Sequence, residues 1–485
     1  MAQLDPDFRK SLDAAYALAT SHLENLDQTS VAATVDLATL RERINKPLER
    51  AGVAPEQVIN DLAEDVAGGL LGSAGGRFFG WVIGGTLPAA VGADWLTSVW
   101  QQNSALYACS PAAAVVEETV GIWLQDVLGL PKQASFALVT GCQMAHVTCL
   151  AAARHALLRN RGWDVETQGM FGAPAIRILS SSERHGSFER AVRLLGFGQS
   201  QVKLLPVDDQ GRLVAEALEA ELKKDTAAPT LVLLQAGDIN IGAYDEFAKL
   251  IPIARRYGAW VHVDGAFGLW AGASSRFRHL VKGIEAADSW ATDGHKWLNV
   301  PFDSGFAFVA DREAHRASLS IRASYLTHAT DARDQVDWNP EWSRRARGFP
   351  AYAALRQLGR DGVAELVERC CRHAHSLTTR IGALAGAEVL WEPTINQGLV
   401  RFLDLEAGSS LSGRLPAAEA EAAHDRRTDQ IIAAILKTGE AFFGGTTWRG
   451  RRAMRISVTN WRTSDADVDR VVNAIAGVLV SEARA

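Results

Sequence analysis

Two neighbouring stretches decide the fold of this chain: WVHVDGAFGLWAG at 260–272 and ADSWATDGHKWLNVP at 287–301. In the first, a run of apolar residues ends at Asp264. In the second, a similar run ends shortly before His295 and Lys296. Both runs are short and apolar on both sides, which is typical of strands buried within a parallel sheet. We therefore expect one carboxylate and one amine at the carboxyl ends of two strands.

Short apolar runs alternate with helical patterns through the middle of the chain. This alternation predicts an α/β fold, with a mostly parallel sheet covered by helices on both faces. The predicted strands are ASFALVT (134–140), AIRILSS (175–181), QVKLLPV (201–207), TLVLLQA (230–236), AWVHVD (259–264), DSWAT (288–292) and SGFAFVA (304–310). Ligands bind such sheets beyond the carboxyl ends of the strands, where Asp264 and Lys296 are expected.

The 485 residues of the chain divide into three predicted regions. Residues 1–85 form an N-terminal helical segment that ends in a glycine-rich stretch. Residues 86–350 form a large domain that contains the sheet, and residues 351–485 form a smaller α+β domain that opens with a long helix. The segment 406–427 is rich in serine, alanine and charged residues, and we expect an exposed insertion or mobile loop there.

The composition is that of a globular protein, with 47% hydrophobic and 22% charged residues. A formal net charge of -6 gives no case for a nucleic acid or an anionic membrane as partner. The N-terminus lacks the pattern of a secretory signal, and no uncharged apolar run is long enough to span a membrane. We expect a cytoplasmic protein. Its five cysteines have no metal-ligand spacing, so no metal site is predicted.

Asp264 and Lys296 together suit pyridoxal 5′-phosphate. A lysine forms a Schiff base with the aldehyde of this cofactor, and an aspartate partners its cationic ring nitrogen. Lys296 lies beside Trp297 and Leu298, and we expect this apolar setting to lower the pKa of the amine and make it nucleophilic. Taken singly, the lysine could extend to the surface and the aspartate could cap a helix. Their pairing at two strand ends favours the cofactor.

Two further features suit the same cofactor. His185 follows a predicted strand and precedes a helix, where its ring can lie on the cofactor ring and reach a substrate carboxylate; a purely structural histidine is the alternative. The turn VTGCQMAHV at 139–147 places Gly141, Cys142 and Gln143 at the start of a long helix, where backbone amides bind phosphate. Glycine turns before helices are common, so this second feature is weaker alone.

With these residues in place, the chain resembles the group II pyridoxal-phosphate-dependent amino acid decarboxylases, which include aromatic-L-amino-acid, tyrosine, histidine and glutamate decarboxylases. The resemblance runs from about residue 76 to about residue 470, and its most specific blocks are HVDGAFG and DGHKWLNVP. It also includes RFFGWV, RHGSFERAVRLLG, SYLTH and RRARGFPAYAALRQLGRDG. It implies fold type I, with a mostly parallel seven-stranded sheet and a smaller C-terminal α+β domain. It also implies a homodimer with active sites at the subunit interface.

The resemblance assigns roles by position. Lys296 matches the Schiff-base lysine, Asp264 the partner of the ring nitrogen, and His185 the histidine stacked on the ring. The other matched positions are His295, Asp293, Asn240 and Ala266 near the cofactor, Gly141, Cys142 and Gln143 at its phosphate, and Phe79, Trp81 and His328 in the substrate pocket. Relatives often carry asparagine where Asp293 stands and threonine where Asn240 stands.

One departure from the resemblance concerns a mobile loop. Relatives that act on aromatic substrates carry a tyrosine there, thought to protonate the carbon that has lost carbon dioxide. The matching segment, HATDARDQVDW at 328–338, contains no tyrosine, and Gln335 takes the tyrosine's place by spacing. The nearest tyrosine is Tyr325, in the preceding element. Either another group, such as His328 or a residue of the partner subunit, delivers the proton, or the carbanion has a different fate.

We therefore expect a carboxy-lyase that decarboxylates an L-amino acid to its amine, with an aromatic or large side chain favoured. One alternative is decarboxylation followed by oxidation of the carbanion with dioxygen, which gives an aldehyde, ammonia and peroxide. Aldolase-type cleavage of the Cα–Cβ bond is another, and a cofactor-binding protein without turnover is a minor one. The expected partners are a small amino acid and a second copy of the chain.

Overall fold

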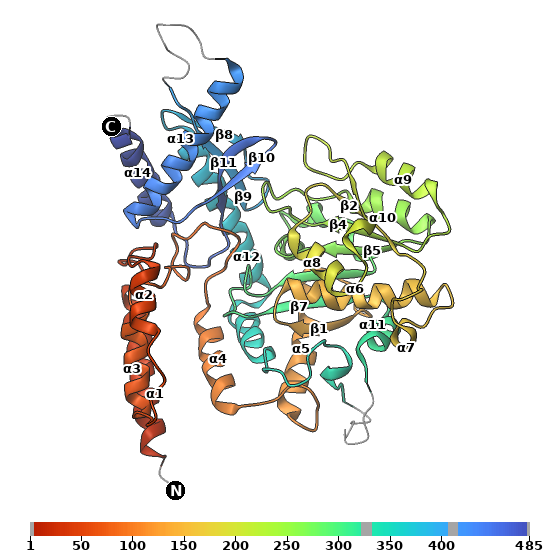
Figure 1. The fold of residues 1–485 in the computed structure, drawn as a ribbon, viewed down its shortest axis with the longest axis horizontal. Helices are drawn as coiled ribbons and strands as arrows, with labels where there is room; N and C mark the ends of the chain where they lie inside the picture. The colour runs from red at the N-terminus through yellow and green to blue at the C-terminus, as the bar shows by residue number, and fades with distance from the viewer. Residues whose placement is uncertain (1–3, 322–331, 406–415, 483–485) are drawn as a thin grey trace.

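A computed structural model describes residues 4–321, 332–405 and 416–482 of the chain (Figure 1). Its centre is a seven-stranded sheet in the order β1-β7-β6-β5-β4-β2-β3. The strands are β1 (Ser135–Val139), β2 (Arg177–Ser181), β3 (Val202–Leu205), β4 (Thr230–Gln235), β5 (Trp260–Asp264), β6 (Ser289–Asp293) and β7 (Gly305–Val309). Only β7 runs against its neighbours. The predicted fold type I sheet, mostly parallel and seven-stranded, is confirmed.

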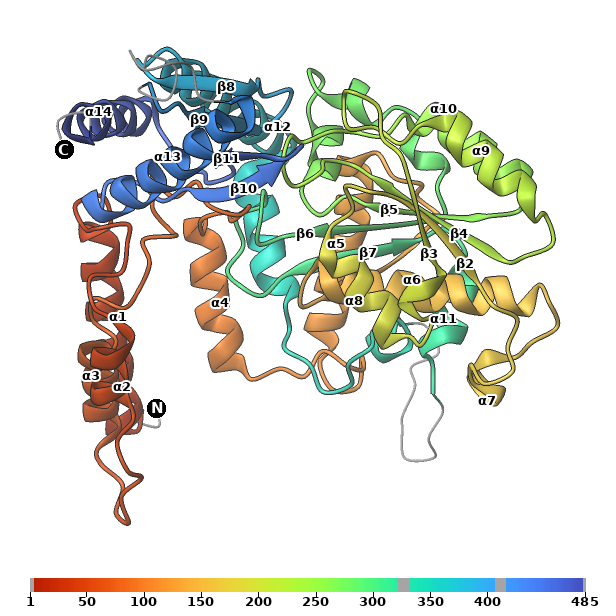
Figure 2. The ribbon, with the colours of Figure 1, turned by 45° about the horizontal axis from the view of Figure 1, so that its top comes forward.

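The large sheet is buried on both faces, because alternate residues of its strands pack into two separate apolar clusters. On β5, Val261 and Val263 belong to the cluster that includes helices α5 (Pro111–Leu128), α9 (Ala215–Lys224) and α10 (Phe247–Arg256). Trp260 belongs to the opposite cluster, formed with α6 (Cys142–Arg159), α8 (Gly186–Leu194) and α11 (Arg312–Leu319). Figure 2 shows α9 and α10 on one side of the sheet and α6, α8 and α11 on the other. Side chains at every second position of β5, counted from Trp260, therefore face α6.

The second sheet is antiparallel, in the order β10-β11-β9-β8, and packs with α12 and α13, which in turn contact α14. Its strands are β8 (Ala387–Trp391), β9 (Gln397–Phe402), β10 (Gly444–Trp448) and β11 (Arg451–Ser457). The helices are α12 (Gly348–Gly382), α13 (Ala417–Thr438) and α14 (Asp465–Glu482). The sequence did not predict β10, whose first two residues are glycines, and only pairing with β11 identifies it. Helix α12 crosses the predicted boundary at 350/351; the three predicted domain ranges stay a prediction.

The expectation of a loop over 406–427 is wrong for its second part. Residues 406–415 lie outside the described ranges, but α13 begins at Ala417. Alanine and glutamate, which suggested a solvated loop, are also strong helix formers. The helix packs through Ala423 and Ile431, and its Glu421 lies 2.6 Å from the guanidinium of Arg401 on β9. Contact with the second sheet thus selects the helix.

The N-terminal helices form an arm that stands apart from both sheets (Figures 1 and 2). The arm consists of α1 (Pro6–Asn25), α2 (Leu37–Ile44) and α3 (Pro55–Asp65), none of which contains a buried residue in the single chain. Large apolar side chains such as Phe8 and Tyr16 are exposed on it. Two more helices complete the described set, α4 (Pro88–Trp100) and α7 (Val165–Gln168). No helix in the described ranges has the length and apolar character needed to cross a bilayer.

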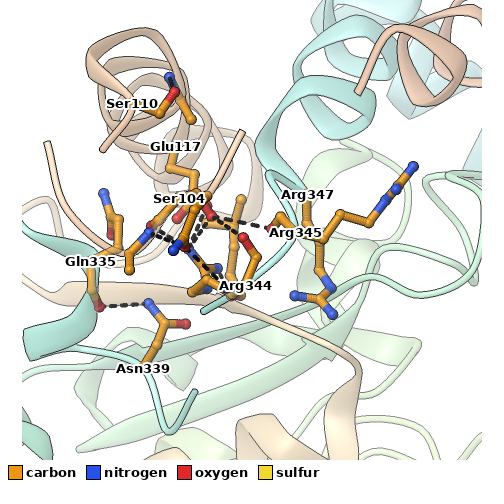
Figure 3. Close-up of polar contacts among 12 residues, drawn as sticks. Ser104, Ser110, Glu117, Gln335, Asn339, Arg344, Arg345 and Arg347 are labelled. Atoms are coloured by element: carbon orange, nitrogen blue, oxygen red, sulfur yellow. Dashed lines mark hydrogen bonds and ion pairs between the residues drawn. The ribbon is translucent and has the colours of Figure 1, made fainter. Parts of the chain in front are cut away.

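A buried ion pair ties α5 to the segment that precedes α12 (Figure 3). Glu117 Oε1 and Arg344 Nη1 lie 2.6 Å apart, and neither side chain is exposed. Arg344 also donates to Ser104 Oγ at 2.9 Å and to the carbonyl of Leu138 in β1. Because a buried charge without its partner is costly, this pair fixes the segment against the edge of the large sheet.

Candidate active site

A cavity of about 380 Å³ lies at the carboxyl ends of β4, β5 and β6. β5 and β6 are adjacent and parallel, so Asp264 at the end of one and Asp293 at the end of the other face the same space. Most of the residues predicted to bind the cofactor line this cavity. They are Gly141, Cys142, Gln143, His185, Asp264, Ala266, Asp293, His295 and Lys296.

The amine of Lys296 is paired with a carboxylate. Its Nζ lies 2.9 Å from Oδ2 of Asp293, and the side chains of both residues are largely buried. Burial alone would lower the pKa of Lys296, but the negative charge and hydrogen bond of Asp293 outweigh it and raise the pKa above its ordinary value. The expectation of a lowered pKa is therefore wrong for the cofactor-free chain. The sequence shows Asp293 three residues before Lys296 but does not show that the turn between them brings the two side chains into contact.

Asp293 also takes part in the start of α6. Its Oδ1 accepts a hydrogen bond of 2.6 Å from the backbone N–H of Cys142, and His295 Nε2 lies 3.4 Å from the same oxygen. The N-terminus of a helix attracts negative charge, which explains why the carboxylate settles there. Asp293 thus occupies one of the amides that the sequence suggested for a phosphate.

The carboxylate of Asp264 is held from three sides. Its Oδ1 accepts a hydrogen bond of 3.1 Å from the backbone N–H of Ala266, and Cys142 Sγ lies 3.9 Å from the same oxygen. Nε2 of His146 lies 3.5 Å from Oδ2. Burial of Asp264 would raise its pKa, but the contact with His146, with smaller help from His185, holds the pKa below its ordinary range. An ionised aspartate suits a protonated ring nitrogen.

His185 and His295 both line the cavity. His185 caps the N-terminus of α8 and is exposed to solvent, with Nδ1 2.8 Å from Ser187 Oγ and 3.2 Å from the Ser187 amide. His295 Nδ1 accepts from the Ser304 amide at 3.2 Å. Although His185 as a whole residue is exposed, its side chain lines the cavity, and partial loss of hydration lowers its pKa below the ordinary value. The same effect lowers the pKa of His295. Both rings are therefore oriented by bonds through Nδ1 and are largely neutral at neutral pH.

The residues around the start of α6 fit a phosphorylated cofactor. Nε2 of Gln143 is buried and has no hydrogen-bond partner within the described ranges, although Gln143 lines the cavity. Gly141, the N-cap residue of the helix, provides no capping side chain, and a Cβ there would come within 3.1 Å of His295. An unpaired amide donor, the helix N-terminus that Asp293 caps only at Cys142, and the ammonium of Lys296 together provide donors for an anion.

Three predicted site residues do not line the cavity in the single chain. Phe79 is fully buried against Phe443, and Trp81 is 52% exposed beside Phe442. Asn240 accepts a hydrogen bond of 2.8 Å from Thr446 of β10 instead. His328 lies outside the described ranges, so the substrate pocket predicted from these positions stays a prediction.

Gln335, which takes the place of the relatives' tyrosine by its spacing in the sequence, also lies outside the cavity lining. It is fully buried in the short helix η5 (Gln335–Asp337), and its side-chain oxygen accepts a hydrogen bond of 2.8 Å from Arg333. The described part of the segment thus offers no side chain in place of the missing tyrosine.

Sequence patterns did not identify three residues of the site, two beside Asp264 and one whose charge acts on His185. His146 follows Cys142 by four residues on α6, a spacing that places both on one helix face and could have pointed to it. His262 shares the parity of Asp264 on β5. Arg455 on β11 is buried, has no hydrogen-bond partner for Nε within the described ranges, and adds to the positive potential at His185. No local pattern marks Arg455, because it comes from the second sheet.

Comparison with known proteins agrees with this geometry. The chain is 26% identical to an aromatic-L-amino-acid decarboxylase of Bacillus atrophaeus, over 95% of this chain and 93% of that protein. It is 28% identical to an L-2,4-diaminobutyrate decarboxylase of Rhizobium meliloti (strain 1021), over 80% and 74% respectively. A crystal structure of Oryza sativa TDC with PLP and tryptamine shares its fold, with a TM-score of 0.90, 22% identity and 99% of each chain covered. Residues 39–403 match the family model of the pyridoxal-dependent decarboxylase conserved domain. The chain is therefore a member of the pyridoxal-dependent decarboxylase family, a carboxy-lyase whose cofactor is pyridoxal phosphate.

Proposed function

We propose that this enzyme removes the α-carboxylate of an L-amino acid with an aromatic or large side chain, and that Lys296 holds the cofactor as a Schiff base. The observation that carries the proposal is the single cavity at the ends of β5 and β6. Asp264 and Lys296 line it together, while a histidine and an unpaired amide donor line the same space. An amine, an ionised carboxylate and phosphate donors are the three contacts that the cofactor needs.

When bound, pyridoxal phosphate supplies a sink for the electrons released as carbon dioxide leaves. Asp264, ionised through its contact with His146, would keep the ring nitrogen protonated. His185 would hold the substrate carboxylate and the ring, because its bond to Ser187 fixes the plane of the imidazole. Gln143 would donate to the phosphate, which competes with Asp293 for the amides at the start of α6.

Arg455 offers a second contact for the substrate. Its guanidinium is buried and lies near enough to lower the pKa of His185 through its charge. We place the negative charge of the substrate between His185 and Arg455, because a buried cation with an unpaired N–H is stabilised by a carboxylate. The preference for a large side chain rests on the aromatic residues Phe79 and Trp81 alone.

The attachment of the cofactor is tested by spectroscopy of the purified protein. We expect a near-ultraviolet to visible absorbance band of lysine-bound cofactor in the native enzyme and its loss in Lys296→Ala. Lys282→Ala, a change at an exposed position of the same residue type, is the matched control and should keep the band. A band that survives in Lys296→Ala would show that another residue holds the cofactor.

The reaction is tested by incubating the native enzyme with a panel of L-amino acids while carbon dioxide, amine, aldehyde and peroxide are followed together. Simple decarboxylation gives amine equal to carbon dioxide, and no peroxide. A second candidate, oxidative decarboxylation, consumes dioxygen and water and gives equal amounts of aldehyde, carbon dioxide, ammonia and hydrogen peroxide. The segment 328–338, which lacks a tyrosine, favours testing this route alongside the first. Absence of carbon dioxide with every substrate would contradict both.

We also propose that two copies of the chain form a homodimer through the N-terminal arm. Helices α1, α2 and α3 bury no residue in the single chain, yet they expose Phe8, Leu12 and Tyr16. Such an apolar surface is more stable when covered. Sedimentation analysis should give twice the chain mass for the full chain and a smaller species for Phe8→Asp/Tyr16→Asp. A full chain that sediments as a monomer at high concentration would refute the dimer.

The cytoplasmic location expected from the sequence stays a prediction.

A further inference from the structure

We propose that His146 is a positioning residue that donates the proton on its Nε2 to Asp264, and that His262 and Ser289 hold its ring in the tautomer that permits this. The inference rests on the proposed function in one respect, because it takes Asp264 as the partner of the cofactor's ring nitrogen. It adds a line of buried groups behind that partner.

The four side chains form a continuous line from the cavity into the protein. Nε2 of His146 lies 3.5 Å from Asp264 Oδ2, and Nδ1 of His146 lies 2.8 Å from His262 Nε2. Nδ1 of His262 lies 2.9 Å from Ser289 Oγ. His146, His262 and Ser289 are fully buried, so water cannot replace any of these contacts. The line crosses from α6 through β5 to β6.

The topology explains why these groups meet. His262 and Asp264 stand two residues apart on β5, so both face α6, where His146 lies. Ser289 is the partner of His262 in the parallel pairing of β5 with β6. The line is therefore built from the regular elements that form the sheet, and it does not depend on a loop.

The hydrogen-bond donors fix the direction of the line. An ionised Asp264 only accepts, so the nitrogen of His146 that faces it, Nε2, must carry a proton. In a neutral ring Nδ1 is then an acceptor, which requires His262 to donate from Nε2. Ser289 Oγ already accepts from Trp260 Nε1 at 3.0 Å, which leaves its own proton for His262 Nδ1. Each member of the line thus donates once toward the cavity.

Two further observations agree with neutral groups behind Asp264. Burial lowers the pKa of His262 to about 3, so its ring stays neutral. Cys142, whose Sγ lies 3.5 Å from His146 Nε2, is buried beside Asp264, and both effects raise the pKa of its thiol well above the ordinary value. A neutral His262 and a neutral Cys142 thus add no charge of their own beside the carboxylate of Asp264.

The consequence concerns the charge of the bound cofactor. A buried carboxylate that loses one of its donors takes up a proton more readily, and a protonated Asp264 would no longer hold a protonated ring nitrogen. Without His146, Asp264 would keep the Ala266 amide on Oδ1 but lose the donor on Oδ2. The donor from His146 therefore strengthens the binding of pyridoxal phosphate through its ring nitrogen and leaves binding through the aldehyde and phosphate unaffected. This difference separates the proposal from a purely structural role.

The experiment measures two dissociation constants for each variant of the cofactor-free protein, in the absence of amino acid. One ligand is pyridoxal phosphate, and the other is the analogue in which a carbon replaces the ring nitrogen. In His146→Asn the side-chain amide can reach only the position of Nδ1, so this variant keeps the contact with His262. In His146→Gln the amide reaches the position of Nε2, so this variant keeps the contact with Asp264. His155→Asn, later on α6 and paired with Glu166, is the matched control.

We expect His146→Asn to lose preference for pyridoxal phosphate over the analogue by about tenfold to a hundredfold, the usual range for a hydrogen bond to a charged group. His146→Gln and His155→Asn should keep the preference within about threefold. Equal loss of both ligands in His146→Asn, or a His146→Gln variant that loses as much preference as His146→Asn, would overturn the proposal. Thermal unfolding shows whether each variant is folded. The ratio of the two dissociation constants is then compared between folded His146→Asn and folded His146→Gln. Because no substrate is present, a failed decarboxylation assay leaves this result intact.

Discussion

Replacement of Asp293 by asparagine should speed the covalent attachment of pyridoxal phosphate to the cofactor-free enzyme. Only the neutral amine of Lys296 attacks an aldehyde, and the carboxylate 2.9 Å away holds the amine protonated. At an effective dielectric constant of about 20, charges at this distance attract by about 6 kcal/mol. Even a quarter of that energy, left after burial of the amine is counted, corresponds to about a factor of ten in the fraction of neutral amine.

Asparagine keeps the geometry of the site. Its side-chain oxygen can still accept from the Cys142 amide, while its amide group faces Lys296 without charge. Removal of the carboxylate also removes repulsion against the cofactor phosphate, which acts in the same direction. Asp126→Asn, at an exposed pair with Arg360, removes the same charge far from the cavity and serves as the control.

The assay follows the absorbance of lysine-bound cofactor after mixing cofactor-free protein with pyridoxal phosphate at neutral pH. We expect the second-order rate to rise about tenfold or more in Asp293→Asn and to stay unchanged in Asp126→Asn. An unchanged or slower rate in Asp293→Asn would refute the reasoning, because it would mean that the carboxylate does not control the protonation of Lys296.

Three further predictions follow from the same contacts. Because Asp293 raises the pKa of Lys296, the rate of cofactor attachment to the native enzyme should increase with pH from 7 to 9, by about tenfold per unit while the amine remains mostly protonated; a rate that falls over this range would contradict the assignment. Glu117→Gln, which leaves the buried Arg344 without its charge partner, should lower the free energy of unfolding in a urea titration by about 3–5 kcal/mol, whereas the exposed Asp126→Asn should lower it little. Arg455→Met should raise the KM for the amino acid at least tenfold with a smaller effect on kcat, and a KM equal to that of the native enzyme would exclude Arg455 from substrate binding.

The sequence predicted the parts of this fold that local patterns encode. Seven short strands, most of them buried and separated by helices, give the sheet. Asp264 ends one strand and Lys296 follows the end of another, so their shared cavity could be expected. The state of Lys296 could not, because it depends on the charge of Asp293 at short range and not on the apolar residues around it. The position of Arg455 was also beyond local patterns, because it comes from the second sheet. The spacing of His146 from Cys142 marks a helix face, but its contacts with Asp264 and His262 come from a separate strand.

Where the sequence reading failed in the smaller sheet, pairing was the missing information. Strand β10 reads as glycine and threonine until its register with β11 is known. The start of α13 reads as a polar loop until Arg401 of β9 is seen to contact Glu421. The composition of a segment alone allows either a loop or a regular element. For β10 the pairing with β11 selects the strand, and for the start of α13 the contact with Arg401 selects the helix.

Helix α12 makes the two sheets a single folding unit. Its first part, with Ala351 and Leu355, and its last part, with Leu377 and Ile381, belong to one continuous apolar cluster that also includes Val261 of β5 and Val400 of β9. A positive φ of 61° at Gly359 bends the helix between the two parts, which glycine permits without strain. Truncation of the chain at the start of the smaller domain would therefore expose both parts of one apolar core. We expect the two sheets and their helices to unfold together in one cooperative transition.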